Sequence, residues 1–302
     1  MRKKDKKMTE YMLNFKEIEI SDKPWMDNIL HNENNLGCEY CFGNLFIWKD
    51  YFKSVVSKAD ENIFIFSNKG KGYLYPTGKG DLEKAVLNLK SHAETNGRVF
   101  KMNGVDEEKK ALLEKIFPGK FTYTPYESGF DYIYNSSDLA ELAGKKYHAK
   151  RNHIARFLEK YDYTFEEITP QNLPDCIALY ESWYEENIVK NEHLYHERDA
   201  ARLVFDNFLS LKMKGALIKI NGKIIAFTIG EHVDARVFAV HIEKADHNIQ
   251  GAYPLINQLF SQTLTNYEYI NREEDMGVEG LRRAKLNYHP AIILKKYEAL
   301  WI

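Results

Sequence analysis

The sequence predicts an α+β protein built from two similar halves. Three observations support this prediction. The chain has 302 residues, of which 44% are hydrophobic, which is enough for about two domains with ordinary cores. Short strand patterns alternate with amphipathic helices, and the same order of elements occurs twice along the chain. Asn221 and Gly222 stand between two apolar runs, which is the strongest short signal for an antiparallel hairpin.

The first half is expected to extend from residue 14 to residue 135. It begins with a short strand at 14–20, and Asp22 then caps a helix that has Pro24 in its first turn. The remaining elements are a helix, a three-strand meander, a helix, a strand, a helix and a strand, expected at 45–52, 54–57, 62–66, 73–75, 81–95, 100–102, 107–116 and 132–134.

The second half, at 136–302, repeats this order after a joining helix. A strand, two helices and a meander are expected at 163–168, 173–187, 197–209, 215–220, 223–230 and 236–243. A helix, a strand, a helix and a final strand follow at 251–265, 267–271, 280–286 and 292–297. The two halves share the order of their elements but no clear residue identity.

A basic helix at 138–160 joins the halves. Asp138 with Glu141 three residues later forms a capping-box pattern at its start. Residues 143–160 contain six Lys and Arg against one Glu. Such a face suits the phosphates of RNA or of a lipid headgroup, and the candidate contacts are Lys146, Lys150, Arg151 and His153. A solvated face on a helix that packs against a domain explains the same pattern.

Composition excludes several classes of protein. Lys and Arg number 42 against 44 Asp and Glu, which excludes a globally cationic nucleic-acid coat. Three cysteines exclude a disulfide scaffold and fit a reducing compartment. Apolar runs such as 224–229 are too short to span a membrane. Residues 1–13 are expected to form a disordered basic tail, since no apolar segment follows it, and the expected location is cytoplasmic or peripheral to the membrane.

Three segments carry a resemblance to a known family. The runs YCFGNLFIW at 40–48 and NREEDMGVEGLRRAKLNYHP at 271–290 resemble motifs of a bacterial family grouped with the C-terminal domain of phosphatidylglycerol lysyltransferase. The order of elements in the second half is similar to that of GNAT acyltransferases, and two such units in tandem resemble the Fem-type aminoacyl transferases. The run KKYHAKRNHI at 145–154 resembles the basic helix of those proteins. The resemblance covers residues 14–302.

This resemblance implies two tandem GNAT-like domains with mixed, mostly antiparallel sheets. It also implies an acyltransferase of the aminoacyl-transfer type, which moves an aminoacyl group from aminoacyl-tRNA to a lipid, peptide or small-molecule acceptor. Two alternatives remain open: an acyl-CoA-dependent N-acetyltransferase, for which acyl-CoA is the cofactor, and a non-catalytic ligand-binding module on the same fold. The oligomeric state and stable membrane insertion are not indicated by any pattern in the sequence.

The C-terminal motif offers the candidate catalytic residues Asp275, Arg282 and Lys285. A strand that ends at Asn271 runs into a polar turn and then a helix, on which Arg282 and Lys285 share one face. The resemblance implies that Asp275 lies where two strands of the sheet separate. It also implies that Asp275 accepts a proton or orients the acceptor amine. The two cations contact phosphate or the developing oxyanion. In the alternative interpretation Asp275 caps the helix and Arg282 pairs with a nearby acid.

The segment Gln250-Gly251-Ala252 is the candidate cofactor-binding loop. It follows an expected strand and opens a helix, which is where GNAT enzymes hold the pyrophosphate of coenzyme A on backbone amides. The sequence departs from the usual pattern, because Tyr253 stands where a small residue belongs. A plain helix start explains the segment equally well.

Cys38 and Cys41 have the C-x₂-C spacing that can indicate zinc or redox chemistry. The sequence has no second pair of cysteines, and Cys176 stands alone in an expected helix. We therefore predict no metal site.

Overall fold

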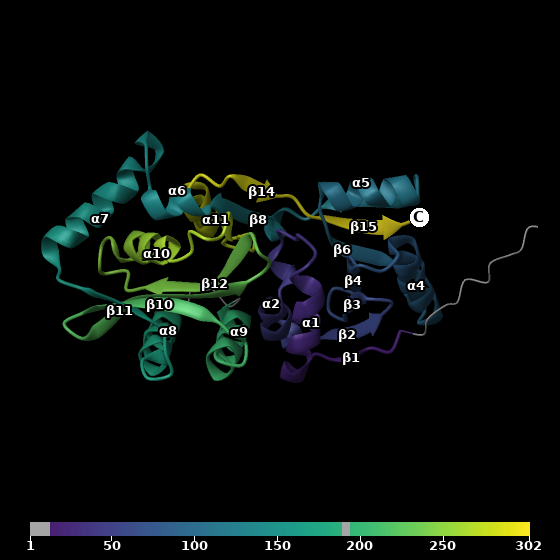
Figure 1. Ribbon diagram of the computed structural model, residues 1–302, viewed down its shortest axis with the longest axis horizontal. Helices are drawn as coiled ribbons and strands as arrows, with labels where there is room; N and C mark the ends of the chain where they lie inside the picture. Colours follow the sequence, from purple (N-terminus) through teal and green to yellow (C-terminus); the bar gives the residue numbers. More distant parts are fainter. Residues whose placement is uncertain (1–12, 189–193) are drawn as a thin grey trace, which may run out of the picture.

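The computed structural model describes residues 13–188 and 194–302. The molecule is elongated, and two sheets lie side by side along its long axis (Figure 1). The tail expected at 1–13 falls outside the described residues except for Leu13, which is buried.

The first sheet has the strand order β1-β2-β3-β4-β6-β15-β7, and β5 pairs with β3. Its pairs are antiparallel except for β4 and β6, which run parallel. The strands are β1 (Lys16–Glu17), β2 (Ser54–Ala59), β3 (Asn62–Ser67), β4 (Gly72–Leu74), β5 (Thr77–Gly78), β6 (Lys101–Val105), β7 (Phe121–Pro125) and β15 (Tyr297–Trp301).

The second sheet has the order β14-β8-β13-β12-β11-β10-β9, with β12 and β13 as its parallel pair. Asn221 and Gly222 form the expected hairpin turn between β10 and β11, with φ angles of 51° and 77°. The strands are β8 (Asp131–Asn135), β9 (Thr164–Glu167), β10 (Lys214–Ile220), β11 (Lys223–His232), β12 (Val237–Ala245), β13 (Tyr269–Asn271) and β14 (Ile292–Leu294). The prediction of mixed, mostly antiparallel sheets is confirmed.

The two halves exchange a strand. β8, which we expected to close the first half, lies between β13 and β14 of the second sheet. β15, the last strand of the chain, lies between β6 and β7 of the first sheet. The expected boundary at 135/136 therefore does not separate the two sheets, because a strand pattern shows that a strand forms but not which strand it pairs with. Each sheet is completed by a strand from the other half.

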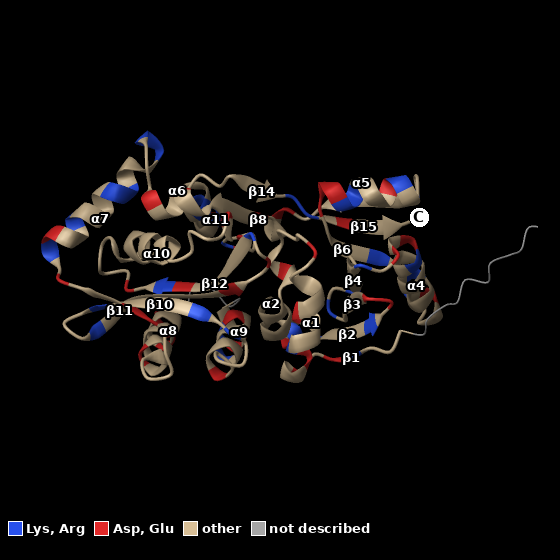
Figure 2. Cartoon of the chain, in the orientation of Figure 1, with Lys and Arg blue, Asp and Glu red and all other residues tan. Residues whose placement is uncertain are grey.

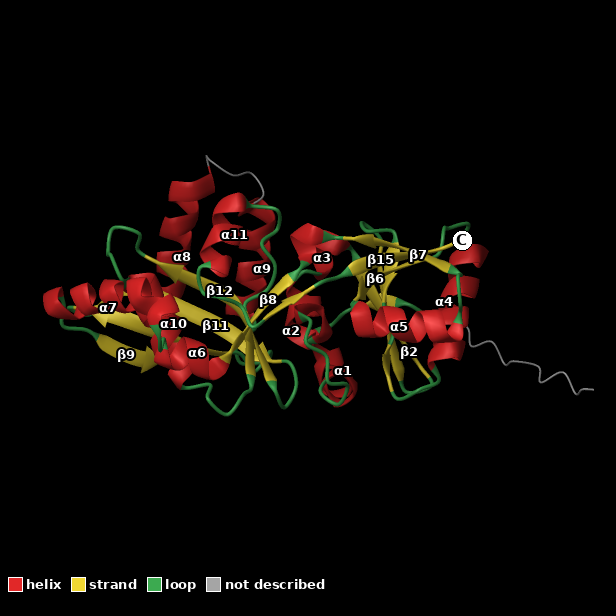
Figure 3. Ribbon diagram, turned by 90° about the horizontal axis from the view of Figure 1, so that it is seen from above, coloured by secondary structure: helices red, strands yellow, loops and turns green. Residues whose placement is uncertain are grey.

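Helices cover both sheets. In Figures 1 and 3, α8 (Leu173–Ile188) and α9 (Leu194–Asp206) lie on one face of the second sheet. The other face is covered by α6 (Ser136–Glu141), α7 (His148–Lys160), α10 (Ala252–Gln262) and α11 (Glu279–Leu286). Helices of the first half are α1 (Lys23–Leu30), α2 (Phe42–Ile47), α3 (Lys49–Phe52), α4 (Leu82–Thr95) and α5 (Glu107–Ile116).

One hydrophobic core connects the halves. Met26 of α1 and Phe42 of α2 belong to the same buried cluster as Tyr180 of α8 and Phe205 of α9. The junction between the sheets is thus a packed interface, and polar groups buried there need partners within it. No helix within 13–188 or 194–302 combines the length and apolar composition needed to cross a bilayer.

Candidate functional site

Asp275 is fully buried in the turn that follows β13. Its carboxylate accepts hydrogen bonds from the Tyr132 hydroxyl at 2.6 Å, the Arg282 Nε at 2.6 Å and the Gly277 amide at 2.8 Å. Burial alone would raise the pKa of Asp275, but the hydrogen bonds from Arg282 and Tyr132 outweigh it and lower the pKa. For Arg282 the structure therefore shows the alternative interpretation, in which this residue pairs with a nearby acid. That acid is Asp275.

Lys285 is also buried, on the inner face of α11. Its ammonium donates to three consecutive backbone carbonyls, those of Arg272, Glu273 and Glu274, the last at 2.7 Å. Burial, together with the charge of Arg272, lowers the pKa of Lys285 to about 8. Lys285 thus fixes the backbone of residues 272–274, and the ion pair with Arg282 fixes Asp275, the next residue of the turn. The three predicted catalytic residues hold the turn in shape.

The turn presents Glu273 and Glu274 to the junction between the two sheets. Lys296, just before β15, forms ion pairs there with Glu39 at 2.6 Å and with Asp131 at 2.7 Å. Asp131 lies at the start of β8, so this pair joins the start of β8, in the second sheet, to the residue just before β15, in the first sheet. Figure 2 shows that Lys and Arg (blue) and Asp and Glu (red) are spread over both halves of the chain.

Asp131 is the fully buried centre of this cluster. It also accepts hydrogen bonds from the Cys38 amide at 2.9 Å and from the Asn271 side chain at 2.8 Å. A buried carboxylate is stable only with such partners. Segments near residues 38, 131, 271 and 296 therefore meet at one point.

Glu274 is partly exposed, as Glu273 is, whereas Asp275 after it is buried. The Cys38 thiol donates to its carboxylate at 3.4 Å. Burial raises the pKa of Glu274, Lys296 opposes this and Asp131 adds to it, and the resulting pKa is about 7. A carboxylate with such a pKa is suited to accept a proton at neutral pH.

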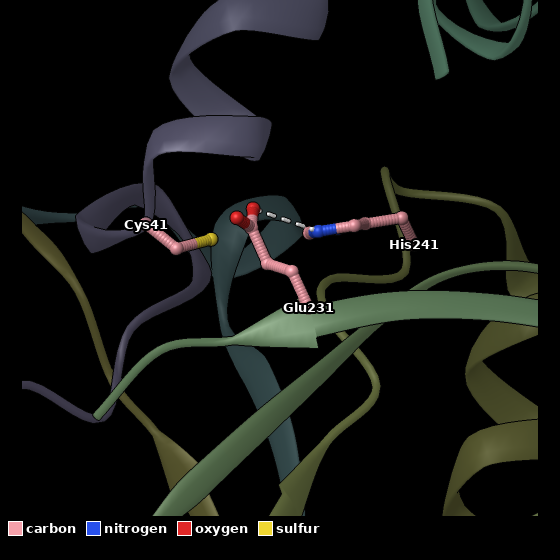
Figure 4. A group of neighbouring side chains, drawn as sticks. All are labelled: Cys41, Glu231 and His241. Atoms are coloured by element: carbon pink, nitrogen blue, oxygen red, sulfur yellow. Dashed lines mark hydrogen bonds and ion pairs between the residues drawn. The ribbon is translucent and has the colours of Figure 1, made fainter. Parts of the chain in front are cut away.

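A second group of polar residues lies beside this cluster. It consists of Cys41, Glu231, His241 and Glu273, and we call it the Cys41 ring. His241 of β12 contacts the Glu273 carboxylate through Nδ1 at 2.7 Å and the Glu231 carboxylate through Nε2 at 3.0 Å. Glu231 accepts hydrogen bonds from the backbone amides of Gly43 and Asn44, both at 3.0 Å. Figure 4 shows the Cys41 sulfur directed toward the Glu231 carboxyl from the opposite side. This ring ties the start of α2 to the second sheet.

The expected pyrophosphate loop is covered by the basic helix. A Cβ atom added at Gly251 would lie 2.5 Å from the backbone oxygen of His153 and 2.9 Å from the Cβ of Phe157, both in α7. The Gln250 side chain contacts His153 Nδ1 at 3.1 Å, and Ala252 is fully buried. In this structure the segment Gln250-Gly251-Ala252 serves as the packing surface for α7.

The helix expected at 138–160 is broken at 142–144 into α6 and α7, and the predicted phosphate contacts on α7 and in the turn at 145–147 before it mostly have partners within the chain. Lys146 pairs with Asp138 at 3.1 Å, and Arg151 donates to the carbonyls of Leu142 and Gly144 at the end of α6. Lys150 lies 3.9 Å from the centre of the Tyr288 ring. Further exposed cations of this region are Lys145, Arg156 and Lys160.

A pocket of about 510 Å³ lies elsewhere, between α8, the hairpin turn at Gly222 and the residues 245–248 after β12. None of the predicted site residues lines it. Two of its carboxylates have partners in the same region, Asp175 with Lys219 at 3.0 Å and Glu186 with the His247 ring at 3.4 Å. We place the candidate site at the junction, where burial and opposed charges shift pKa values.

No motif in the sequence points to Asp131, Glu231, His241 or Lys296. Glu39 and Lys296, for example, are separated by 257 residues and meet only through the strand exchange. One signal was present: His241 and Glu243 alternate with apolar residues along β12, which places two ionisable groups on one face of a buried strand.

Comparisons with known proteins agree with this description. A conserved protein of unknown function from Bacteroides thetaiotaomicron is 38% identical and aligns with a TM-score of 0.93 over 96% of this chain and all of its own. The structure of L-PGS from Bacillus licheniformis is 16% identical, with a TM-score of 0.67 over 96% of this chain and 94% of its own, and this likeness shows the fold alone.

A curated relative, the uncharacterized protein MYCGA3080 of Mycoplasmoides gallisepticum, is 25% identical over 57% of this chain. The match spans 56% of that protein, so this chain corresponds to about half of its length. The structure of FemX has the same fold at 10% identity, with a TM-score of 0.60 over 94% of this chain and 96% of its own. The prediction of tandem GNAT-like, Fem-type domains is confirmed.

The family described as phosphatidylglycerol lysyltransferase, C-terminal, matches residues 32–300, which is most of the chain and includes both halves and the junction between them. The chain belongs to the phosphatidylglycerol lysyltransferase C-terminal family.

Proposed function

We propose that this protein transfers an aminoacyl group from aminoacyl-tRNA to a lipid or peptide acceptor, at the junction between its two sheets. The observation that supports this most strongly is Glu274, a partly exposed carboxylate with a pKa of about 7 in the turn after β13. The family match and the fold shared with L-PGS and FemX support the class of reaction.

In this proposal Glu274 is the general base. It takes a proton from the acceptor amine or hydroxyl as that atom attacks the ester carbonyl of the charged tRNA. The carbonyl–oxygen bond to the ribose breaks, a new bond to the acceptor forms, and the proton passes to the departing ribose hydroxyl. Positioning the two substrates contributes up to about 7–11 kcal/mol in favourable cases, so no covalent intermediate with the protein is needed.

The acyl-CoA alternative finds little support at the expected loop, because α7 packs on Gly251. Binding to the folded protein raises its stability by RT ln(1 + [L]/Kd). We therefore expect acetyl-CoA to leave the melting temperature unchanged, and we expect uncharged tRNA at low salt to raise it. A clear increase with acetyl-CoA would favour the N-acetyltransferase.

We expect α7 and the residues just before it to bind RNA through their exposed cations. Replacing Lys145 and Arg156 by Ala should weaken tRNA binding. For each phosphate that the variant no longer neutralises, the slope of log K against log salt concentration should decrease by about 0.7–0.9. Filter binding at several salt concentrations measures this slope. Lys120→Ala, an exposed lysine between α5 and β7, is the matched control and should leave the slope unchanged.

The direct test of the proposed function uses a pool of tRNA charged with radiolabelled amino acids. Incubation with the protein and with phosphatidylglycerol vesicles or a peptide acceptor should move label from RNA into one acceptor fraction. Retention of all label on the RNA with every acceptor, while tRNA still binds, would support the ligand-binding module. Retention of label without any binding of RNA would contradict the proposal entirely.

A further inference from the structure

We propose that Cys41, Glu231 and His241 form a binding site for a divalent transition-metal ion that joins the two halves of the protein. One sulfur, one oxygen and one nitrogen donor of these residues lie within 4.8 Å of one another, and the cysteine and the glutamate are buried. Thiolate, imidazole and carboxylate are the ligands that proteins use for Zn²⁺. Cys41 comes from the segment before α2, and the other two come from β11 and β12.

The geometry of the ring suits such an ion. Glu231 Oε1 and His241 Nε2 are 3.0 Å apart, close to the roughly 3.3 Å between two ligand atoms on a tetrahedral zinc. His241 Nδ1 contacts Glu273 at 2.7 Å, which is the carboxylate–histidine arrangement that orients metal ligands. The amides of Gly43 and Asn44 fix the Glu231 carboxylate. The Cys41 thiol donates to the Cys38 carbonyl at 3.0 Å, and its sulfur lies within 4.8 Å of the other two donor atoms. Three protein ligands leave the fourth position of a tetrahedral ion for water.

A charged group also lies beside these residues. The ammonium of Lys23, a buried lysine, is 4.0 Å from the Glu231 carboxylate. Binding of a metal ion releases protons from its ligands, because a thiolate and a neutral imidazole coordinate the metal.

The neighbouring group Cys38, Glu39 and Asp131 provides an internal contrast. It offers one sulfur and two carboxylate oxygens within the same 4.8 Å, but no imidazole. The ammonium of Lys296 already lies 2.6 Å from Glu39 and 2.7 Å from Asp131, so a lysine supplies the positive charge there. The Cys41 ring has no lysine this close among the described residues.

Cobalt provides the test, because Co²⁺ bound to a thiolate gives a sulfur-to-metal charge-transfer band in the near ultraviolet and visible d–d bands. We expect chelator-treated protein to take up one equivalent of Co²⁺ with both features and to release protons as the ion binds. Zn²⁺ should abolish the spectrum by competition. The full chain without substitutions suffices for this part, so an unstable variant cannot obscure the answer.

Variants then assign the ligands. Cys41→Ser should remove the charge-transfer band, and His241→Gln should weaken Co²⁺ binding at least tenfold. Cys38→Ser and Cys176→Ser, at the other two buried cysteines, should keep the band. Absence of the band in the unsubstituted protein would overturn the proposal, as would a band that survives Cys41→Ser. Neither result depends on aminoacyl transfer, so the proposed function is tested separately.

Discussion

Glu274→Gln should lower the rate of aminoacyl transfer by about 10²–10⁴-fold, the usual contribution of a general base. The amide keeps the shape of the side chain but cannot take a proton. Binding of tRNA should be unchanged, because α7 lies at the far end of the molecule from the first sheet and outside the junction (Figure 1). Single-turnover transfer from charged tRNA measures the rate, and filter binding measures the affinity.

The pH profile separates a base from a structural residue. Because the pKa of Glu274 is about 7, transfer by the unsubstituted protein should fall as the pH drops below that value, where the carboxyl becomes protonated. The residual activity of Glu274→Gln should lack this decrease. A raised carboxyl pKa also means that the folded state binds the proton more tightly than the unfolded state, so this group lowers stability as the pH rises toward 7.

Glu274→Gln should consequently be at least as stable as the unsubstituted protein above pH 7, which excludes unfolding as the cause of a slower transfer. Glu279→Gln, an exposed acid at the start of α11, is the control in the same segment. Equal transfer rates and equal pH profiles for the unsubstituted protein, Glu274→Gln and Glu279→Gln would show that Glu274 is not the general base.

Lys296→Met should destabilise the protein by about 3–5 kcal/mol, the typical effect of removing one partner from a buried ion pair. Asp131, at the start of β8, would then be left buried beside Glu39 without a cation. Urea unfolding monitored by circular dichroism measures the change in the free energy of unfolding. Lys295→Met, at the exposed neighbouring lysine, should change that free energy by less than about 0.5 kcal/mol.

A second substitution tests the cause. If the destabilisation comes from the unpaired carboxylate, Asp131→Asn in the Lys296→Met background should recover part of the stability, because the amide carries no charge. A destabilisation that stays the same in the double variant would mean that Lys296 contributes through packing of its side chain rather than through its charge.

Much of the fold was predictable because local patterns specify local structure. Asn221-Gly222 predicted the hairpin, and apolar spacing predicted the amphipathic helices. The exchange of β8 and β15 was not predictable from such patterns, since the pattern of a strand does not specify its neighbours. The polar cluster at the junction depends on that exchange, and therefore could not be predicted either.

The sequence motif led to the turn at the junction but not to the side chain that we now propose as the base. The motif at 271–290 pointed to Asp275 and Lys285, which hold the turn through Tyr132 and three carbonyls. The pKa of their neighbour Glu274 is raised because this side chain is partly buried beside Asp131, while Lys296 opposes the shift. Those residues reach it from distant parts of the sequence.

The central claim is that the aminoacyl group binds at the junction between the two sheets. A crystal structure with a non-hydrolysable 3′-aminoacyl-adenosine amide tests this most directly. We predict density for the amide carbonyl beside Glu274, between the 272–275 turn and the segment around Cys38. Density in the pocket between α8 and the loop at 245–248, or beside Gly251 after displacement of α7, would contradict the claim.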